Sequence, residues 1–393
     1  MNAPDMISGE MIAATEIEDA VAWRRHLHRH PELAFQEHET ARFVAGRLAE
    51  WGLAVHRGHG GTGVVGTLSR GTSRRTIALR ADMDALAMQE ETGLAHQSST
   101  PGRMHACGHD GHTAMLLAAA RAVARLPNLD GTVHFVFQPA EENEGGGRRM
   151  VEDGLFRDFP SDAIYGLHNW PALTVGACVA RDDAMMAAFG TFEIAVRGRG
   201  AHGGMPHEGT DPIPAACAIV SALQTIVGRN VSPMESAVVS ATQIHAGDTW
   251  NVIPEHCVIR GTTRWFADTV GDLIERRMRA VAAAIADGFG CTATTNYVRR
   301  YPAVINDPAA AALVRSVASD PALGLAVEDA APSMGSDDFA FMLNEVPGCY
   351  FWLGAARDGE NPRLHSPRYD FNDAILPRGM ALWTRLVQRT LAA

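Results

Sequence analysis

The sequence predicts an α/β protein in which a mainly parallel-sheet domain carries an inserted ferredoxin-like α/β sandwich. Helix-like and strand-like segments alternate up to about residue 185, which is typical of parallel sheets covered by helices. From 187 to 300, apolar and polar residues alternate as in antiparallel strands with one solvent-facing side. Beyond residue 301 the alternation of helix and strand resumes, so the middle segment is predicted to be an insertion.

The first part of the chain supplies most of the parallel sheet. Its strands are rich in β-branched residues, and its helices carry apolar residues at helical spacing, such as Met115, Leu116, Ala119 and Val123. The expected elements are helices at 37–50 and 110–125, strands at 62–69, 75–82, 132–142 and 162–170, and a short helix near 145–156. A chain of 393 residues exceeds one ordinary core, which agrees with two domains.

The inserted part has the element order β-α-β-β-α-β, which is typical of a ferredoxin-like sandwich. Its expected strands lie at 189–200, 235–247, 256–266 and 291–300, and its helices at 211–228 and 269–287. A final helix at 377–391 ends the chain. We therefore expect a discontinuous domain, 1–186 and 301–393, and an inserted domain, 187–300.

The composition disfavours several classes of partner. The formal net charge is −11 and the basic residues form no long run, which argues against nucleic acid and acidic membranes. The start of the chain carries Asp5 and Glu10 where a secretion signal would need a basic flank and an apolar run. Apolar stretches such as 114–120 are shorter than the roughly 18 residues of a membrane span. The six scattered cysteines are expected to be reduced, so we expect a soluble cytoplasmic protein.

The stretch MHACGHDGHT, residues 104–113, lies at a predicted strand-to-helix junction, where α/β proteins place functional side chains. Cys107 and His109 flank Gly108, so a sharp turn can direct a thiolate and an imidazole to one point. These residues alone leave three interpretations open. They are a metal site, a cysteine nucleophile with a histidine base, and a helix cap beside a buried cysteine.

Similar polar residues follow other predicted strands. Glu141 and Glu142 come after the strand that reaches Gln138, and adjacent carboxylates repel unless a cation or a shared proton relieves them. His168 ends the next strand, and His365 lies in a proline-flanked loop. One cysteine, three histidines and a glutamate suit borderline ions such as Zn²⁺ or Mn²⁺. Five ligands exceed one tetrahedral site, which favours two metals that share a bridge.

Two aspartates stand at another strand end, in the stretch RADMDAL. Asp84 is a candidate to orient a metal-bound histidine through the ring N–H. Asp82 is explained equally well as a turn or helix-capping residue, so we assign it no role.

Short motifs stand in order along almost the whole chain: RADMDAL, HACGHDGHT, FQPAEE, GLHNW, GRGAHGGMPHEG, NVIPE, GTTR, MGSDDF and LHSPRYDFND. In these motifs the chain resembles the dinuclear metallo-amidohydrolases of the hippurate hydrolase, aminoacylase and auxin-conjugate hydrolase family. These enzymes are relatives of succinyl-diaminopimelate desuccinylase and carboxypeptidase G. The resemblance covers roughly residues 20–390.

The resemblance implies a ligand set for two divalent ions, which could be zinc, manganese or cobalt. Cys107 would bridge the two metals. His109 and His168 would complete one site, and Glu142 and His365 would complete the other. The discontinuous domain would then be the catalytic, metal-binding domain.

The resemblance also implies an activity, the hydrolysis of the amide bond of N-acyl amino acids. Glu141 would be the general base, which takes a proton from a metal-activated water and passes it to the leaving amine. His202 would reach across a dimer interface to stabilise the oxyanion, and Asn251 and Arg264 would hold the substrate carboxylate. The inserted domain would thus serve as a dimerisation or lid domain, in a homodimer or homotetramer.

Three other interpretations stand beside this activity, two of them enzymatic and one not. The same centre could serve a dipeptidase or carboxypeptidase. Cys107 and His109 could instead act as nucleophile and base, but that pairing leaves Glu142, His168 and His365 without a task. A catalytically inert, metal-binding relative that acts in assembly is expected to have lost Glu141 or a ligand, and this chain retains them all.

The sequence departs from the family pattern at two positions. Ala87 stands where relatives commonly have proline, and Asp337 stands where many have glutamate. Neither is a proposed ligand. We expect these changes to affect the local turn and the shape of the acyl pocket.

Overall fold

The computed structural model describes residues 12–142 and 144–392, which form two compact units. The first unit comprises the chain up to residue 185, residues 304–331 and the chain from residue 337. The second unit comprises residues 186–303 and 332–336. The start of the chain with Asp5 and Glu10 lies outside the described residues.

Three short segments belong to a different unit from the one that the predicted domain boundaries assign them to. Residue 186 and residues 301–303 and 332–336 group with the second unit, although the sequence places them in the first. Strand β13 extends through Tyr301, and the Ala187 amide donates to the carbonyl oxygens of Ser333 and Gly335 at 3.0 and 2.8 Å. These backbone hydrogen bonds join residues far apart in the chain, which local sequence patterns do not reveal.

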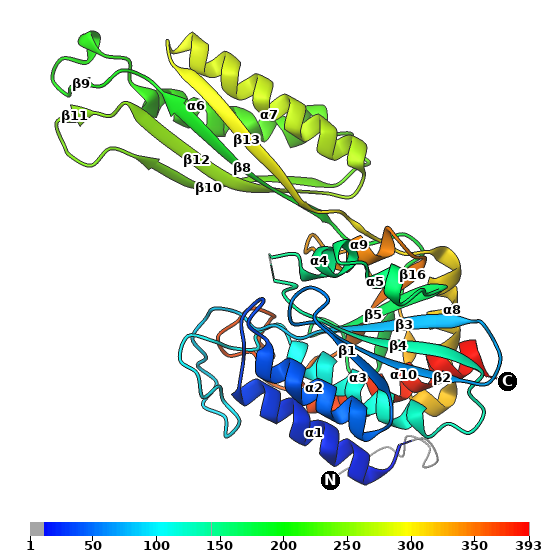
Figure 1. The fold of residues 1–393 in the computed structure, drawn as a ribbon. Coiled ribbons are helices and arrows are strands. Elements are labelled where there is room, and N and C mark those ends of the chain that lie inside the picture. Colours follow the sequence, from blue (N-terminus) through cyan, green and yellow to red (C-terminus); the bar gives the residue numbers. More distant parts are fainter. Residues whose placement is uncertain (1–11, 143, 393) are drawn as a thin grey trace. The chain divides into compact units, whose positions relative to one another are not determined.

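The first unit is a mixed sheet with helices on both faces (Figure 1). Its helices are α1 Ala14–Arg29, α2 His38–Glu50, α3 His109–Ala124, α4 Gly146–Glu152, α5 Leu155–Asp158, α8 Pro308–Ala318, α9 Phe339–Leu343 and α10 Leu376–Leu391. Its strands are β1 Ala54–Arg57, β2 Val64–Arg70, β3 Thr76–Asp82, β4 Gly131–Gln138, β5 Ala163–Trp170, β6 Ala177–Val179, β7 Ala184–Met186, β14 Val304–Ile305, β15 Ala326–Val327 and β16 Gly348–Gly354.

The main sheet has the strand order β1-β2-β4-β3-β5-β16-β6-β15. Strands β4, β3, β5 and β16 are parallel to one another and form its centre. Strand β2 pairs antiparallel with β4, and β6 pairs antiparallel with β16. The predicted α/β class with a mainly parallel central sheet is therefore confirmed.

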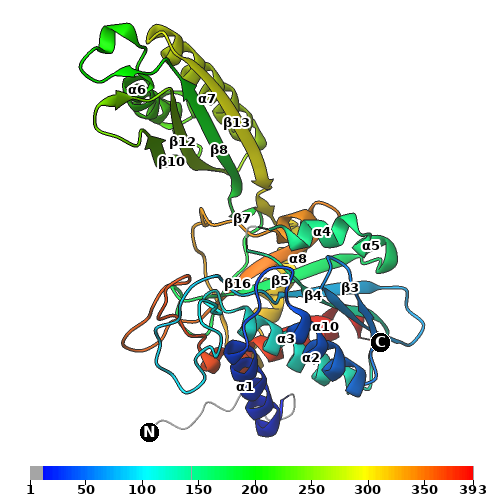
Figure 2. The ribbon, with the colours of Figure 1, turned by 60° about the vertical axis from the view of Figure 1, so that its left-hand side comes forward.

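Helices α1, α2, α3 and α10 lie on one face of this sheet and α4, α5 and α9 on the other, as two views show (Figures 1 and 2). The core under α3 and α10 contains fully buried side chains such as Leu117, Phe135, Phe351 and Trp383. Helix α3 is apolar on almost every side, with all but two of its residues buried, as a helix between a sheet and other helices must be. This packing fixes the start of α3 against the strand ends.

The second unit contains β8 Ala188–Arg197, β9 Ala201–His202, α6 Pro212–Thr225, β10 Ala237–Ala246, β11 Val252–Ile253, β12 His256–Trp265, α7 Asp268–Gly288 and β13 Thr292–Tyr301. Its antiparallel sheet has the order β10-β12-β8-β13. Helices α6 and α7 pack on one face, where Ile219, Leu223, Ile274 and Met278 are fully buried. Helix, strand and sheet order are those of a β-α-β-β-α-β sandwich.

From the sequence we considered only apolar stretches that are shorter than a membrane span, but one helical segment of the second unit is longer. Residues Pro212–Asn230 form a helical stretch of 19 residues that is long and apolar enough, by length and composition alone, to cross a membrane. Its buried side chains, including Ala215, Ala216 and Ile226, pack in the core of the second unit. A core helix of a small sandwich meets the same length and composition criterion.

Candidate metal centre

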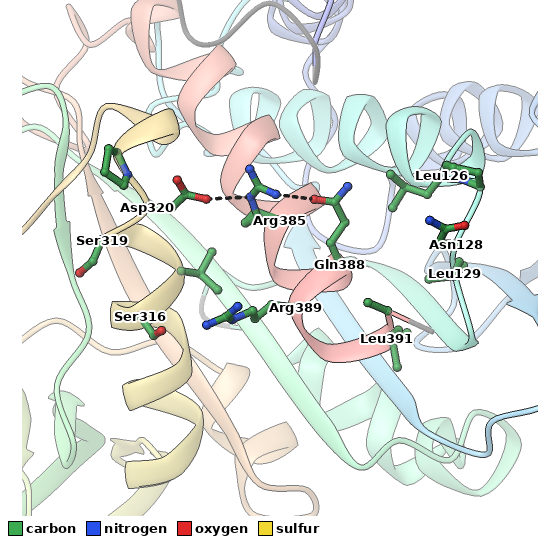
Figure 3. Close-up of a pocket in the computed structure, with 14 residues that line it drawn as sticks. Leu126, Asn128, Leu129, Ser316, Ser319, Asp320, Arg385, Gln388, Arg389 and Leu391 are labelled. Carbon is green, nitrogen blue, oxygen red and sulfur yellow. Dashed lines mark hydrogen bonds and ion pairs between the residues drawn. The ribbon is translucent and has the colours of Figure 1, made fainter.

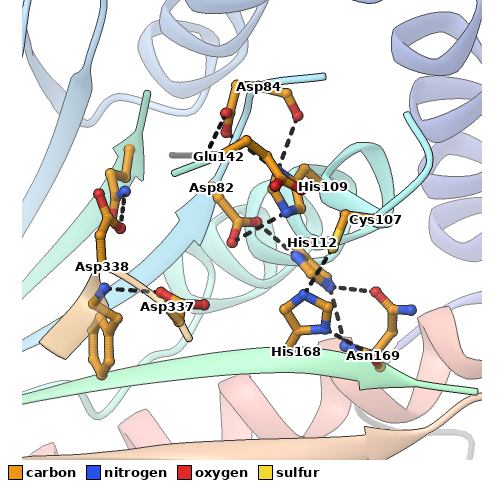
Figure 4. Close-up of polar contacts among 12 residues, drawn as sticks. Asp82, Asp84, Cys107, His109, His112, Glu142, His168, Asn169, Asp337 and Asp338 are labelled. Carbon is orange, nitrogen blue, oxygen red and sulfur yellow. Dashed lines mark hydrogen bonds and ion pairs between the residues drawn. The ribbon is translucent and has the colours of Figure 1, made fainter. Parts of the chain in front are cut away.

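The predicted ligands lie at the carboxyl ends of three central strands, where Figure 4 shows Cys107, His109, Glu142 and His168. β3 ends at Asp82 and β4 at Gln138, and these two residues are register partners in the parallel pair. His168 lies near the end of the adjacent β5. Because β4 ends at Gln138, residues 139–142 form a turn beyond the strand. Loops at this edge open onto the site where open α/β sheets place their ligands.

Gly108 explains how the HACGHDGH stretch turns. It precedes α3 with a φ of 93°, in the left-handed region that glycine adopts without strain. A Cβ at this position would lie 2.3 Å from Oδ1 of Asn169, so no larger residue fits. The turn places Cys107 and His109 on the same side, facing the strand ends (Figure 4).

Five side chains form two overlapping groups of potential ligands. Sγ of Cys107, His109 and His168 offer donor atoms within 4.8 Å of one another, and so do Cys107, Glu142 and His365. Sγ of Cys107 lies 3.4 Å from Nε2 of His168, and Nε2 of His365 lies 3.2 Å from Oε1 of Glu142. Cys107 belongs to both groups. The structure thus brings all five predicted ligands together, with the thiol in the bridging position.

The donor set fits two divalent cations on chemical grounds. Thiolate, imidazole and carboxylate are the donors that zinc and its neighbours prefer. Nε2 of His109 is buried and makes no hydrogen bond with any residue that the structure describes. An orphaned buried nitrogen at the centre of a donor cluster is costly unless a cation or proton occupies the space before it. His365 also has a φ of 63°, unusual for histidine, which is the kind of strain that functional sites retain.

Without a cation, protons are held at these donors. Hydrogen bonds to Cys107 and Glu142 raise the pKa of His365 to about 10. Burial and the Glu142 carboxylate raise the pKa of the Cys107 thiol. Burial lowers the pKa of His109, but the Asp82 and Asp84 carboxylates outweigh it and the net pKa is well above the usual range. A cation that binds here must displace protons, so it binds more tightly as the pH rises.

The same electrostatics disfavour a thiol nucleophile. Catalytic cysteines need a depressed pKa and partial exposure, whereas Cys107 is buried and its pKa is raised. Nδ1 of His109, moreover, already faces Asp84. The cysteine is therefore better suited to bind a metal as a thiolate than to attack a substrate.

Asp84 contacts two members of the cluster. Nδ1 of His109 lies 2.9 Å from the Asp84 carbonyl oxygen and 3.2 Å from Oδ1, so the ring can donate here and turn Nε2 toward the cluster. The Glu142 amide donates to Oδ2 of Asp84 at 3.0 Å. One buried carboxylate therefore orients one ligand from α3 and one from the turn after β4.

Replacement of Asp84 tests this arrangement. We expect Asp84→Ala to weaken metal affinity by roughly 10- to 100-fold, the usual effect of losing an outer partner of a metal-bound histidine. Competition with a chromophoric chelator measures the affinity. Asp329→Ala, which changes an aspartate with a side chain 95% exposed, is the control and should leave the affinity unchanged. Equal affinity in Asp84→Ala and wild type would contradict the role of Asp84.

The sequence analysis did not find the hydrogen-bonded chain that lies beneath the ligands. Nη1 of Arg80 donates to Asp82 at 2.7 Å, and Oδ1 of Asp82 lies 2.6 Å from Nδ1 of His112. Nε2 of His112 lies 2.6 Å from Oδ1 of Asn169, whose Nδ2 donates to the Tyr369 hydroxyl at 2.7 Å. Asp82 therefore anchors the site. The one sequence signal was Arg80, a charge within an apolar strand.

Glu141 is buried among carboxylates. Burial, followed by the neighbouring Asp337 and Glu142, raises the pKa of Glu141 well above its usual range. Asp337 accepts hydrogen bonds from the Tyr350 hydroxyl at 2.6 Å and from Arg80 at 3.1 Å. Asp337 is thus hydrogen-bonded to the same Arg80 that contacts Asp82, and its charge raises the pKa of the candidate base Glu141.

Three predicted residues belong to the second unit. His202 on β9 pairs with Val252 on β11, and the Gly203 amide donates to the Asn251 carbonyl at 2.7 Å, so His202 and Asn251 lie together and exposed. Arg264 lies near the other end of β12, where its guanidinium stacks on Phe189 with 4.2 Å to the ring centroid.

Asn251 and Arg264 are not brought together within one chain. The residues of β12 from His256 to Arg264 extend over about 26 Å, at roughly 3.3 Å per residue, and Asn251 precedes that strand. Asn251 and Arg264 therefore lie toward opposite ends of this strand, and the joint role that the resemblance implies stays a prediction. Local motifs do not reveal which end of a strand each residue occupies.

A separate cavity of about 660 Å³ lies beside the last turns of α8 and α10 (Figure 3). Arg385 on α10 contacts Asp320, which follows α8, at 3.0 Å, and Gln388 of its own helix at 3.2 Å. None of the described residues that line it is a histidine or cysteine. The cavity therefore lacks the ligands and proton carriers that are gathered at the strand ends.

Comparison with known proteins agrees with the geometry. The sequence model of peptidase family M20/M25/M40 matches residues 78–389. An N-acetyl-L-cysteine deacetylase of Bacillus subtilis is 40% identical over 354 residues, which cover 90% of this chain and 83% of the relative. A hippurate hydrolase of Campylobacter jejuni is 39% identical over 370 residues, which cover 94% and 95%.

A solved structure extends the likeness to the fold. The crystal structure of the Bacillus subtilis YXEP protein, described as a dinuclear metal-binding peptidase from the M20 family, matches with a TM-score of 0.83 at 35% identity. The match covers 95% of this chain and 97% of that chain. This chain is therefore a hydrolase that belongs to peptidase family M20/M25/M40.

Proposed function

We propose that this enzyme hydrolyses the amide bond of N-acyl amino acids with two divalent metal ions and Glu141 as general base. The observation that carries the proposal is the position of Glu141, a buried carboxyl group directly beside a donor set for two cations. The two relatives described above, a deacetylase of N-acetyl-L-cysteine and a hydrolase of hippurate, are named for substrates of this class.

Cys107, His109 and His168 would hold one metal ion, and Cys107, Glu142 and His365 the other. Divalent ions in such a pair lower the pKa of water and polarise a carbonyl oxygen. The thiolate favours zinc, while manganese or cobalt also suit imidazole and carboxylate donors.

The residues of this chain would move one proton. Glu141 accepts it from water as the water attacks the amide carbonyl, and donates it to the nitrogen of the leaving amino acid. Burial raises the pKa of Glu141 in the metal-free protein, and two adjacent cations would lower it again, so that the carboxylate can accept the proton of water and still return it to the amine.

The substrate carboxylate and the oxyanion would be held by residues of the second unit. Arg264 has no carboxylate partner among the residues that the structure describes, so its guanidinium is available for an anion. His202 and Asn251 lie together before the start of β12, whereas Arg264 lies near its end, about 26 Å from His256, and this separation supports their acting on a partner chain's substrate. We therefore propose a homodimer, or a homotetramer built from dimers, and a cytoplasmic enzyme whose cysteines stay reduced.

A substrate panel tests the proposal. We expect benzoyl-, acetyl- and indoleacetyl-amino acids to be hydrolysed, and dipeptides with free amino groups to be poor substrates. Release of the free amino acid is measured with metal-loaded protein. Faster cleavage of dipeptides would assign the centre to a dipeptidase or carboxypeptidase. A folded, metal-loaded protein that cleaves none of these compounds would point to an inert relative that acts in assembly.

A further inference from the structure

Glu37 is a fully buried carboxylate that lies outside the ligand set. It immediately precedes α2, and its side chain has an exposed fraction of 0%. Oε1 accepts a hydrogen bond from the backbone amide of Ala140 at 2.8 Å, and Oε2 accepts one from the Thr62 hydroxyl at 2.6 Å. A residue more than 100 positions away in the chain is thus attached to the turn that carries Glu141.

The amide that Glu37 holds belongs to a strained residue. Ala140 has a φ of 53°, in the left-handed region that residues with a Cβ rarely adopt. Without an external contact, the turn at 139–142 would relax to a more common conformation and redirect the two glutamates that follow. Strain of this kind persists only where the surroundings over-determine it.

The same turn is held at a second point. The Glu142 amide donates to Asp84 at 3.0 Å, so two buried carboxylates hold amides on either side of Glu141. Burial, followed by the Asp84 carboxylate, raises the pKa of Glu37 to about 7. Burying two like charges here is costly, and the hydrogen bonds to the turn offset part of that cost.

We propose that Glu37 is a positioning residue, which holds the Ala140 amide so that the 139–142 turn presents Glu141 to the water it deprotonates. The two attachments then have different tasks. Asp84 secures the metal-ligand side of the turn through Glu142, and Glu37 secures the base side through Ala140. The role assigned to Glu141 rests on the proposed function, whereas the attachment itself does not.

Substitutions at Glu37 separate positioning from stability. We expect Glu37→Ala to lower kcat by about 10- to 100-fold, as loss of an outer partner does, while KM stays within about twofold and both metals are retained. Glu37→Gln should stay within about threefold of wild type. Its amide oxygen can accept from Ala140, and its NH₂ can donate to the Thr62 hydroxyl, which can also accept.

A second readout does not depend on turnover. Hydrogen exchange of the Ala140 amide, measured on the metal-loaded protein, should be at least about tenfold faster in Glu37→Ala than in wild type and nearly unchanged in Glu37→Gln. Glu39→Ala, at an exposed glutamate in the first turn of the same helix, is the matched control and should behave as wild type.

The outcomes are distinguishable. Rapid Ala140 exchange with low kcat in Glu37→Ala, and recovery of both in Glu37→Gln, support the proposal. Wild-type exchange in Glu37→Ala overturns it, and so does a Glu37→Gln variant as impaired as Glu37→Ala. If Glu37→Ala does not fold, Glu37→Asp replaces it, because the shorter side chain withdraws the carboxylate from the Ala140 amide, and wild-type kcat and exchange there overturn the proposal. A wild type that cleaves no N-acyl amino acid defeats the proposed function alone, because the exchange measurement still tests the attachment.

Discussion

Glu141→Gln should lower kcat by roughly 10²- to 10⁴-fold, the usual contribution of a general acid–base group, and leave two metals bound per chain. The amide keeps the size of the carboxyl group but can neither accept the proton of water nor pass it to the amine. Metals should remain because the two groups of donor atoms that share Cys107 do not need Glu141. Hydrolysis of a benzoyl-amino acid and metal analysis of the same sample provide the measurement.

Glu142→Gln is the matched comparison, since it changes the neighbouring glutamate in the same way. It should weaken binding of the metal held with His365 and lose activity for that reason. If Glu141→Gln loses metal and Glu142→Gln keeps it, the two roles are reversed. Full turnover in Glu141→Gln would exclude it as the base.

Removal of the metals should reduce turnover to below about 1% of the loaded enzyme. Metals in such sites lower the pKa of water from 15.7 to about 7, and the proposed mechanism depends on that activation. Exhaustive chelation with metal analysis, followed by reconstitution with zinc, manganese or cobalt, measures the effect. Turnover that survives verified metal removal would disprove the two-metal proposal.

The metal affinity itself should rise with pH. His365, with a pKa of about 10, and the Cys107 thiol, whose pKa is raised, hold protons at neutral pH in the metal-free protein. Each proton that a cation displaces changes the affinity by up to about tenfold per pH unit, so binding at pH 8 should be tighter than at pH 6. Affinity that does not depend on pH between these values would mean that neither group loses a proton on binding.

Some of the site followed from sequence because its residues lie in local motifs. PAEE directly follows β4, HNW forms the end of β5, and HACGHDGH leads into α3, while parallel strands necessarily end at a common edge. The residues that hold the site in place from other parts of the chain could not be predicted from the sequence. Glu37, Arg80 and Tyr369 contact Ala140, Asp337 and Asn169, which lie far away in the chain, and nothing in the local sequence identifies these partners.

The domain division shows the same limit. The change near residue 187 from the residue pattern of a parallel sheet to that of antiparallel strands was visible, because side-chain periodicity is a local property. The return of residues 332–336 to the second unit was not, because it depends on backbone hydrogen bonds to Ala187. The opposite placement of Asn251 and Arg264 on the second unit was equally hidden.

The sequence by itself determined the α/β class, because periodicity is a local property, and its short motifs predicted the five ligands and the candidate base through the family that they resemble. Only the tertiary structure decided which distant residues hold these side chains in place. It buried Glu141 beside Asp337, joined Asp82 to His112 and attached the strained Ala140 to Glu37. Burial and long-range hydrogen bonding set the pKa values and the side-chain directions, and both depend on residues that meet only after folding.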